Sequence, residues 1–148
     1  MNDDLAIRYR IDELEVAMNA HPLKKKNRVE HEFFGGIYAR TIFMQTGDRI
    51  VSMIHKFDHH YAILEGVCSV WINGEWQLLS APHKGLTKAG TRRILWVHLS
   101  CIWVTFHRTD IVPEDDSEEA KNRAVGLVRD EIIEKNPRVE LMKQKLIQ

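Results

Sequence analysis

The sequence predicts a mainly-β fold, a small barrel with helices before and after it. Seven of the eight glycines fall between residues 33 and 110. Between them lie short runs rich in Ile, Val, Trp, Tyr, Phe and Thr, the residue types favoured in strands. Asn73-Gly74 separates two of these runs and is a strong hairpin signal. Regularly spaced short strands with glycine turns indicate a sandwich or barrel rather than an alternating α/β fold.

The length and the charge of the chain restrict what the protein can be. Its 148 residues correspond to one average domain. The 21 Lys and Arg residues balance the 21 Asp and Glu residues, which excludes a globally basic nucleic-acid binder. The one basic cluster, at residues 24–28, is expected to be a solvated linker, so nucleic-acid binding is not predicted.

The first segment, residues 1–32, is expected to hold one helix and a connector. Asp3 and Asp4 supply first-turn acids, and Pro22 ends the helical pattern of residues 1–20. Residues 23–32 are strongly charged and are predicted to be a connector. The apolar residues that recur at helical spacing are Leu5, Tyr9, Ile11, Leu14 and Met18.

The second segment, residues 33–110, is expected to form the barrel. The strand signals are runs of four to nine residues with β-branched and aromatic side chains. The segment Pro82–Gly85 is expected to be a turn. The predicted strands are 37–44, 49–57, 61–64, 67–72, 76–79, 92–97 and 102–107.

The third segment, residues 111–148, is expected to be helical. An amphipathic pattern runs over residues 118–134, Asn136-Pro137 breaks it, and residues 138–147 can form a last short helix. These amphipathic ends need an apolar surface, either the barrel of the same chain or a second subunit. We therefore expect a homo-oligomer, with a two-fold dimer as the default.

Cysteine content and hydropathy point to an intracellular protein. Cys68 and Cys101 are too few for a disulfide framework or a zinc ribbon, and both lie in apolar runs. We predict two buried free thiols in a reducing compartment. The N-terminus has no hydrophobic signal core, and the longest apolar stretch, 94–106, is too short and too polar to cross a bilayer. We predict a cytoplasmic location, in a cell or in an infected host, without a membrane.

Histidines form the group of side chains most suited to chemistry. The chain has eight, and six lie in the strand-rich zone, residues 33–110. In a strand over 49–57, His55 shares a face with Met53 and Phe57, a wall suited to lining a cavity. One of two adjacent strand residues points outward, so His59 and His60 are alternatives. Converging imidazoles can hold Zn, Mn, Fe or Ni, and the candidate metal ligands are His55, His59, His60 and His107.

The stretch GDRIVSMIHKFDHHYAILEGVCSVWING resembles the first motif of the cupins, with Gly47, His55 and residues 61–66 in suitable places. The stretch APHKGLTKAGTRR is similar to the second motif. The WVTFH run ending at His107 is similar to small cupin-like proteins of tailed bacteriophages and prophages. The resemblance covers residues 33–110. It implies a double-stranded β-helix (jelly-roll) barrel and a homo-oligomer.

The chain departs from the cupin pattern at the metal site. The usual histidine pair falls on Met53 and His55, or on His55 and Phe57, so one member is apolar in either alignment. The usual acid falls near Asp58 or His59. Arg93 stands where the second motif has its histidine, and arginine has no lone pair for a metal. A standard site of three histidines and one glutamate is absent, and a rearranged site from His55, His59 or His60, and His107 remains.

Three functions stay open at this point. In the first, the barrel holds a small anionic or sugar-like ligand with Arg93, Tyr61 and Trp103, although Arg93 can equally pair with Asp48, Glu65 or Asp58. In the second, a metal-dependent isomerase, epimerase or dioxygenase uses the histidines, with Tyr61 or Glu65 as proton carrier. In the third, the barrel is a structural or assembly component, for example of a virion. Whether the protein is an enzyme is left open by the sequence.

Overall fold

The structure is a computed structural model that describes residues 3–20 and 26–147. The helices are α1 (Asp3–Ala20), α2 (Glu118–Ile132) and α3 (Pro137–Ile147). The strands are β1 (Arg28–Phe34), β2 (Ile37–Met44), β3 (Arg49–Val51), β4 (His59–Ile72), β5 (Glu75–Ser80), β6 (His83–Thr87) and β7 (Ile94–Arg108). All the strand pairs are antiparallel.

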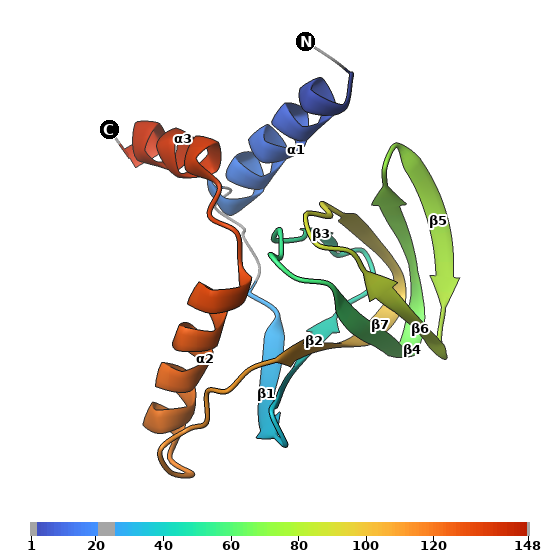
Figure 1. Cartoon of the computed structure of the whole chain (residues 1–148). Coiled ribbons are helices and arrows are strands. Elements are labelled where there is room, and N and C mark those ends of the chain that lie inside the picture. The colour runs from blue at the N-terminus through green and yellow to red at the C-terminus, as the bar shows by residue number, and fades with distance from the viewer. Residues whose placement is uncertain (1–2, 21–25, 148) are drawn as a thin grey trace.

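Two long strands, β4 and β7, pair with each other through both halves of the barrel (Figure 1). The first half of β4 also pairs with β6, and the matching part of β7 pairs with β2, which continues to β1. The second half of β4 pairs with β5, and the matching part of β7 pairs with β3. Side chains from both halves meet in one buried cluster. The arrangement is the jelly-roll type of barrel that the sequence predicts.

A bulge at Gly66 bends β4 between its two halves. The pairing with β7 shifts register between Ile63 and Cys68. Gly66 has a φ of +96°, and a Cβ there would lie 2.3 Å from the carbonyl oxygen of Ser100. Only glycine fits such a backbone conformation at such a close approach. The runs 61–64 and 67–72, predicted as separate strands, are therefore one bent strand, and residues 94–97 and 102–107 are likewise parts of β7.

Three local predictions from the sequence are wrong. The expected connector 23–32 contains the start of β1, an edge strand whose side chains alternate between exposed and half-buried. The expected turn Pro82–Gly85 contains the start of β6, which pairs with β4. The expected strand 49–57 ends at Val51, and residues beyond it leave the sheet. The predicted hairpin is confirmed, because Asn73 and Gly74 both have positive φ.

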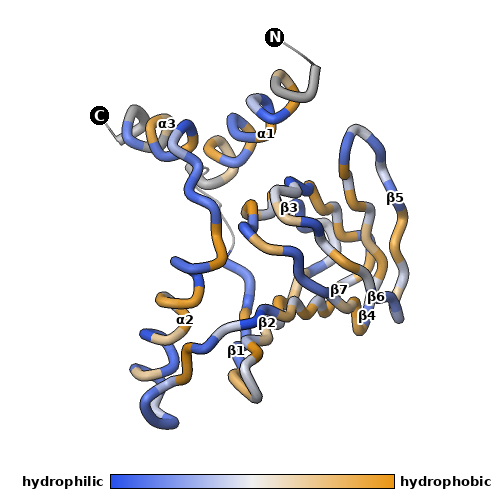
Figure 2. Tube along the Cα trace, in the orientation of Figure 1, coloured by the Kyte–Doolittle hydropathy of each residue, from blue (hydrophilic) through white to orange (hydrophobic). Residues whose placement is uncertain are grey.

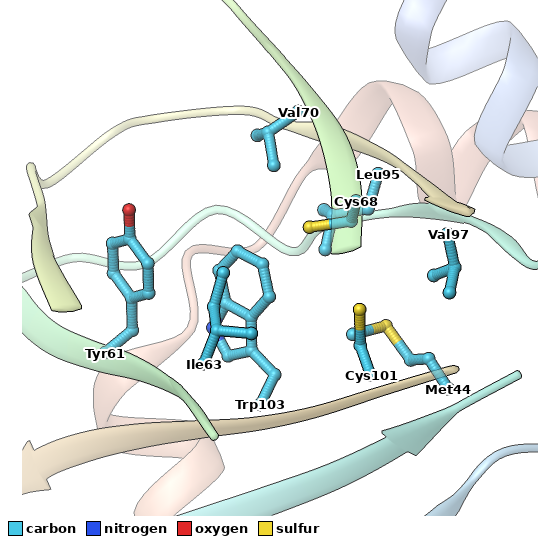
Figure 3. Close-up of a cluster of buried hydrophobic side chains, with 9 residues drawn as sticks. All are labelled: Met44, Tyr61, Ile63, Cys68, Val70, Leu95, Val97, Cys101 and Trp103. Atoms are coloured by element: carbon cyan, nitrogen blue, oxygen red, sulfur yellow. The ribbon is translucent and has the colours of Figure 1, made fainter. Parts of the chain in front are cut away.

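The core of the barrel is a cluster of nine buried side chains (Figure 3). Cys68 and Cys101 lie in it as free thiols, as the sequence predicts. Burial is the main cause that raises the pKa of the Cys68 thiol to about 12, so this group stays protonated. The cluster consists of Met44, Tyr61, Ile63, Cys68, Val70, Leu95, Val97, Cys101 and Trp103.

Helix α2 lies along the β1–β2 side of the barrel (Figure 1). Hydrophobic and hydrophilic residues alternate along it (Figure 2), and its apolar side is buried. Val125, Val128 and Ile132 pack against Tyr38 of β2, which is fully buried. Ser117 caps the helix, accepting a hydrogen bond from the amide of Ala120 at 3.1 Å.

Helices α1 and α3 lie together at one end of the barrel (Figure 1). Arg92, which precedes β7, forms ion pairs with Asp12 at 3.2 Å and Glu15 at 2.7 Å on α1. The guanidinium of Arg138 on α3 lies over the ring of Tyr9, 4.3 Å from its centroid. No helix in the described ranges is long and apolar enough to cross a membrane.

Candidate ligand and metal site in the barrel

A cavity of about 170 Å³ opens inside the barrel. Strands β2, β4 and β7 and the end of α2 all contribute to its wall. The segment that follows β3 is joined to the end of α2 by two backbone hydrogen bonds of 2.8 Å, from Lys56 N to Ile132 O and from Glu134 N to Ile54 O. The basic side chains along the cavity are Arg40, His55, His59, Arg93, His107 and Arg129.

Three of the four predicted metal ligands come together in this cavity. His55, His59 and His107 each offer a ring nitrogen, and these nitrogens lie within 4.8 Å of one another. The ring centroid of His59 lies 4.4 Å from that of His55 and 4.6 Å from that of His107. His59 and His107 point inward from β4 and β7, whereas His55 comes from the loop and is held by its backbone bridge to Ile133. Such a triad of imidazoles is a donor set that transition metals accept.

Hydrogen bonds orient two of the three rings. The Nε2 atom of His107 lies 2.9 Å from Thr105 Oγ1. The Nδ1 atom of His59 lies 3.4 Å from the carbonyl oxygen of Phe57, so a proton on Nδ1 is donated to that oxygen. The Nε2 atom of His59 then carries the lone pair, which is the usual arrangement of a metal-binding histidine.

The three imidazoles are neutral at neutral pH. Burial, together with the neighbouring histidines, lowers the pKa of His55 to about 4 and that of His107 to about 3. Burial also lowers the pKa of His59. Neutral imidazole is the form that binds a metal, so the cluster needs to lose no proton at pH 7.

The fourth predicted ligand, His60, is not part of this cluster. Successive residues of β4 point to opposite faces, so His59 faces the cavity and His60 lies exposed outside. Met53 lines the cavity, whereas Phe57 is 61% exposed. His55 therefore shares the cavity wall with Met53 and not with Phe57.

The three predicted ligand-binding residues lie side by side. The guanidinium of Arg93 lies over the ring of Tyr61, 4.8 Å from its centroid. Tyr61 in turn stacks on Trp103, with ring centroids 4.8 Å apart. Arg93 and Trp103 line the cavity, but Tyr61 lies behind them, with its hydroxyl 3.1 Å from Nε2 of His83. Tyr61 therefore supports Arg93 from behind.

The charge of Arg93 has no acidic partner among the described residues. Its side chain is buried, and its Nε atom has no hydrogen-bond partner. The structure shows no ion pair between it and a described carboxylate, so the expected alternative pairing with Asp48, Glu65 or Asp58 is absent. The neighbouring Arg92 forms the buried ion pairs instead. An unpaired buried guanidinium is costly, which makes Arg93 a candidate anion-binding group.

Two further cavity residues, Arg40 and Arg129, were not predicted. Arg40 lies on the inner face of β2 between Tyr38 and Ile42, and its buried Nε atom also lacks a partner. Burial and the charge of Arg129 lower the pKa of Arg40. The sequence could have indicated Arg40, because the two-residue alternation of a strand places this cation on the same face as the apolar Tyr38 and Ile42. Arg129 follows the buried Val125 by one helical turn.

The cavity is strongly cationic. Three guanidinium groups and three imidazoles line it, and no Asp or Glu stands among the described lining residues. Arginine binds carboxylates and phosphates through paired hydrogen bonds, and its charge counts for more away from bulk water. The arrangement can attract and hold a small anion.

Comparisons with known proteins show likeness in fold only. No protein-family model matches the chain, and no curated protein matches it. Protein NMB1881 from Neisseria meningitidis is similar over 64% of this chain and 96% of its own, with 14% identity and a TM-score of 0.50. A Salmonella typhimurium protein assigned to ethanolamine utilization (protein Q) is similar over 58% of this chain and 72% of its own, with 12% identity and a TM-score of 0.50.

A cupin superfamily protein from Desulfitobacterium hafniense also matches, over 58% of this chain and 82% of its own, with 12% identity and a TM-score of 0.47. Identities this low carry no information on activity. The strand arrangement and the two stronger likenesses agree on the fold, a jelly-roll barrel with flanking helices.

Proposed function

We propose that the protein is a cupin-like barrel that binds a small anionic ligand in its cavity. The observation that carries the proposal is the charge of the lining, with Arg40, Arg93 and Arg129 facing one space that holds no described carboxylate. Arg40 and Arg93 each bury an Nε atom without a hydrogen-bond partner. An anion supplies both the missing charge and the missing acceptor.

The energetics favour binding. Burial of a cation without a partner costs several kcal/mol of folding free energy, a cost that the ligand-free protein carries. A carboxylate or phosphate that enters the cavity recovers part of that cost, and this recovery adds to its affinity. Tyr61 holds the guanidinium of Arg93 in place, so little side-chain freedom is lost on binding.

The size and the wall of the cavity limit the ligand. Its volume of about 170 Å³ is below that of pockets for drug-sized molecules, which hold roughly 300–1,000 Å³. Trp103, Leu95 and Ile42 provide an apolar wall for a short carbon skeleton. The hydroxyl-bearing side chains of Thr87 and Thr91 can bond to polar groups of a sugar-like ligand. We infer a metabolite of a few carbon atoms with at least one anionic group.

The histidine cluster favours a second candidate function, metal-dependent catalysis. The cluster of His55, His59 and His107 fits Zn, Mn, Fe or Ni by its donor atoms. A bound metal would supply Lewis-acid chemistry to an isomerase or epimerase, and a redox-active metal such as Fe would supply electron transfer to a dioxygenase. The two expected proton carriers do not reach the cavity, because Glu65 is exposed at the bulge and the hydroxyl of Tyr61 faces His83. This candidate therefore has metal ligands but no carboxylate base among the described residues that line the cavity.

We also propose, from the sequence, that the protein is a homo-oligomer, by default a dimer, in the cytoplasm of a cell or of a phage-infected host. The amphipathic terminal helices and the resemblance to phage cupin-like proteins support this proposal. Sedimentation of the full chain measures the oligomeric state, and a monomer at all concentrations would exclude the dimer.

Thermal shift and calorimetry of the full chain test anion binding. Acetate, malonate, succinate and inorganic phosphate are compared with the neutral amides of the three carboxylates. We expect stabilisation by at least one anion and by none of the amides. Arg93→Gln and Arg129→Gln weaken the binding, whereas Arg123→Gln, on the exposed side of α2, does not. If no anion stabilises the wild-type protein, the proposal is wrong.

A further inference from the structure

The donor atoms of the cavity favour the binding of a metal ion, whereas the positive charges of the cavity oppose it. His55, His59 and His107 offer three nitrogens at a suitable separation. Neutral imidazoles add no negative charge, and no described lining residue is a carboxylate. A divalent cation in the cluster therefore shares the cavity with three guanidinium groups, in surroundings where charges are weakly screened.

The arginines adjoin the histidine cluster from separate elements. Arg40 on β2 is paired in register with Thr105 on β7, and Thr105 is hydrogen-bonded to His107. Arg129 lies on α2, one helical turn before Ile133, which is bridged to His55. Arg93 lies over Tyr61, which shares the inner face of β4 with His59. A metal held by the three histidines cannot avoid these cations.

We propose that the cavity binds a divalent transition metal and a small carboxylate together, each raising the affinity for the other. The carboxylate takes a coordination position that the three histidines leave open, and its charge offsets that of the metal and the arginines. The anion thus replaces the protein carboxylate that a site of three histidines and one glutamate contains. This inference rests on the proposed anion binding and specifies how the same cavity is regulated.

Thermodynamic linkage gives the inference a quantitative form. If a carboxylate raises the metal affinity by some factor, the metal must raise the carboxylate affinity by the same factor. Couplings between two ligands commonly reach about 5- to 150-fold, and direct contact between the ligands favours the upper part of this range. Independent binding at two sites gives a factor of one.

Titration of the full chain with Co²⁺ and with succinate measures this factor. Calorimetry follows Co²⁺ binding with and without saturating succinate, and succinate binding with and without Co²⁺. The visible spectrum of Co²⁺ reports its ligands independently of the heat. Malonate and acetate are used in parallel, and Co²⁺ binding to each free carboxylate is subtracted. We expect an increase of about tenfold or more in each direction, by equal factors.

Two matched pairs of variants locate the effect. His59→Asn removes a ligand inside the cavity, and His60→Asn changes the adjacent exposed residue. We expect Co²⁺ binding to weaken strongly in the first and to stay unchanged in the second. Arg129→Gln removes a repelling charge, so it tightens Co²⁺ binding without carboxylate and reduces the coupling. Arg123→Gln, on the same helix but outside the cavity, keeps the wild-type values.

The outcomes separate this inference from the proposed function. Carboxylate binding that Co²⁺ leaves unchanged overturns the inference and preserves the proposed anion binding. The absence of carboxylate binding with and without Co²⁺ overturns both. Co²⁺ binding that His59→Asn does not weaken places the metal outside the cluster and overturns the inference alone. The inference is supported if Co²⁺ and the carboxylate raise each other's affinity by equal factors and if His59→Asn abolishes this coupling.

Discussion

Arg92 and Arg93 are consecutive and almost equally buried, but only Arg92 forms ion pairs with described carboxylates. Arg92 lies 2.7 Å from Glu15 and 3.2 Å from Asp12, and it fixes α1 to the barrel. Arg93 faces the cavity, over the ring of Tyr61. Two identical side chains at adjacent positions thus differ in their surroundings, because one joins α1 to the barrel and the other lines the cavity.

Substitution of these two residues should change stability in opposite directions. Arg92→Gln leaves the buried Glu15 without its cation and leaves Asp12 with Arg138 alone, so we expect the free energy of unfolding to fall by about 3 kcal/mol. Arg93→Gln removes an unpaired buried charge, and we expect the ligand-free protein to gain up to about 1 kcal/mol. Urea denaturation of both variants measures these values. Equal destabilisation by both substitutions would contradict the separation of roles.

Acidification should destabilise the protein through the histidine cluster. The pKa values of His55, about 4, and His107, about 3, lie below the ordinary value of 6.5, so the unfolded chain binds protons first as the pH falls. The stability from these groups is complete above pH 6.5 and is lost as the pH falls towards the folded-state values.

His107→Asn isolates this effect. We expect the stability difference between about pH 7 and about pH 4.5 to shrink by about 2 kcal/mol relative to the wild-type protein. Carboxylates titrate in both proteins and cancel in the comparison. Denaturant unfolding at the two pH values gives the difference. An identical loss of stability in the two proteins would show that His107 does not resist protonation in the folded state.

The bulge at Gly66 should tolerate no side chain. A Cβ at this position would lie 2.3 Å from Ser100 O and 2.7 Å from Cys101 Sγ, in addition to the unfavourable positive φ. Gly47 also has a positive φ, but no atom lies within 4 Å of its hypothetical Cβ. We expect Gly47→Ala to cost about 1 kcal/mol and Gly66→Ala about 3 kcal/mol or more. Similar unfolding free energies for the two variants would show that the close approach at Gly66 is relaxed.

The ring of Tyr61 should matter for anion binding, and its hydroxyl should not. Tyr61→Phe keeps the aromatic face under Arg93 and loses the interactions of the hydroxyl with His83 and with the Arg93 side chain. Tyr61→Leu removes the aromatic face, so the guanidinium is held less well. We expect about tenfold weaker anion binding in the leucine variant and a change of less than about twofold in the phenylalanine variant, measured by calorimetry. Equal weakening would assign the effect to the hydroxyl.

The fold was predictable where the signal is local. Asn73-Gly74 predicts the turn that it forms itself, and the amphipathic pattern of α2 predicts the helix over the same residues. Both predictions are confirmed. The bend of β4 was not predictable, because a glycine inside a strand and a glycine in a turn look alike in sequence. β1 was missed because its exposed face carries Arg28, Glu30 and Glu32, although its alternation was a strand signal.

The candidate site was predictable in part for a similar reason. Strand alternation and the cupin resemblance led to His55, His59 and His107, which the structure brings together. Arg129 lies on α2, 21 residues beyond the end of β7 at Arg108, so its place in the cavity depends on tertiary packing that no local pattern contains. His60 was excluded only when the orientation of β4 was known.

The two backbone hydrogen bonds between the loop around His55 and the end of α2 have a kinetic consequence. They join Lys56 N to Ile132 O and Glu134 N to Ile54 O, so the wall of the cavity and the helix end separate together or stay closed together. Amide hydrogen exchange at Lys56 and Glu134 therefore measures how often the cavity opens at this wall. The exchange rates of these two amides can therefore be compared with the rate of ligand exchange, in the protein without any substitution.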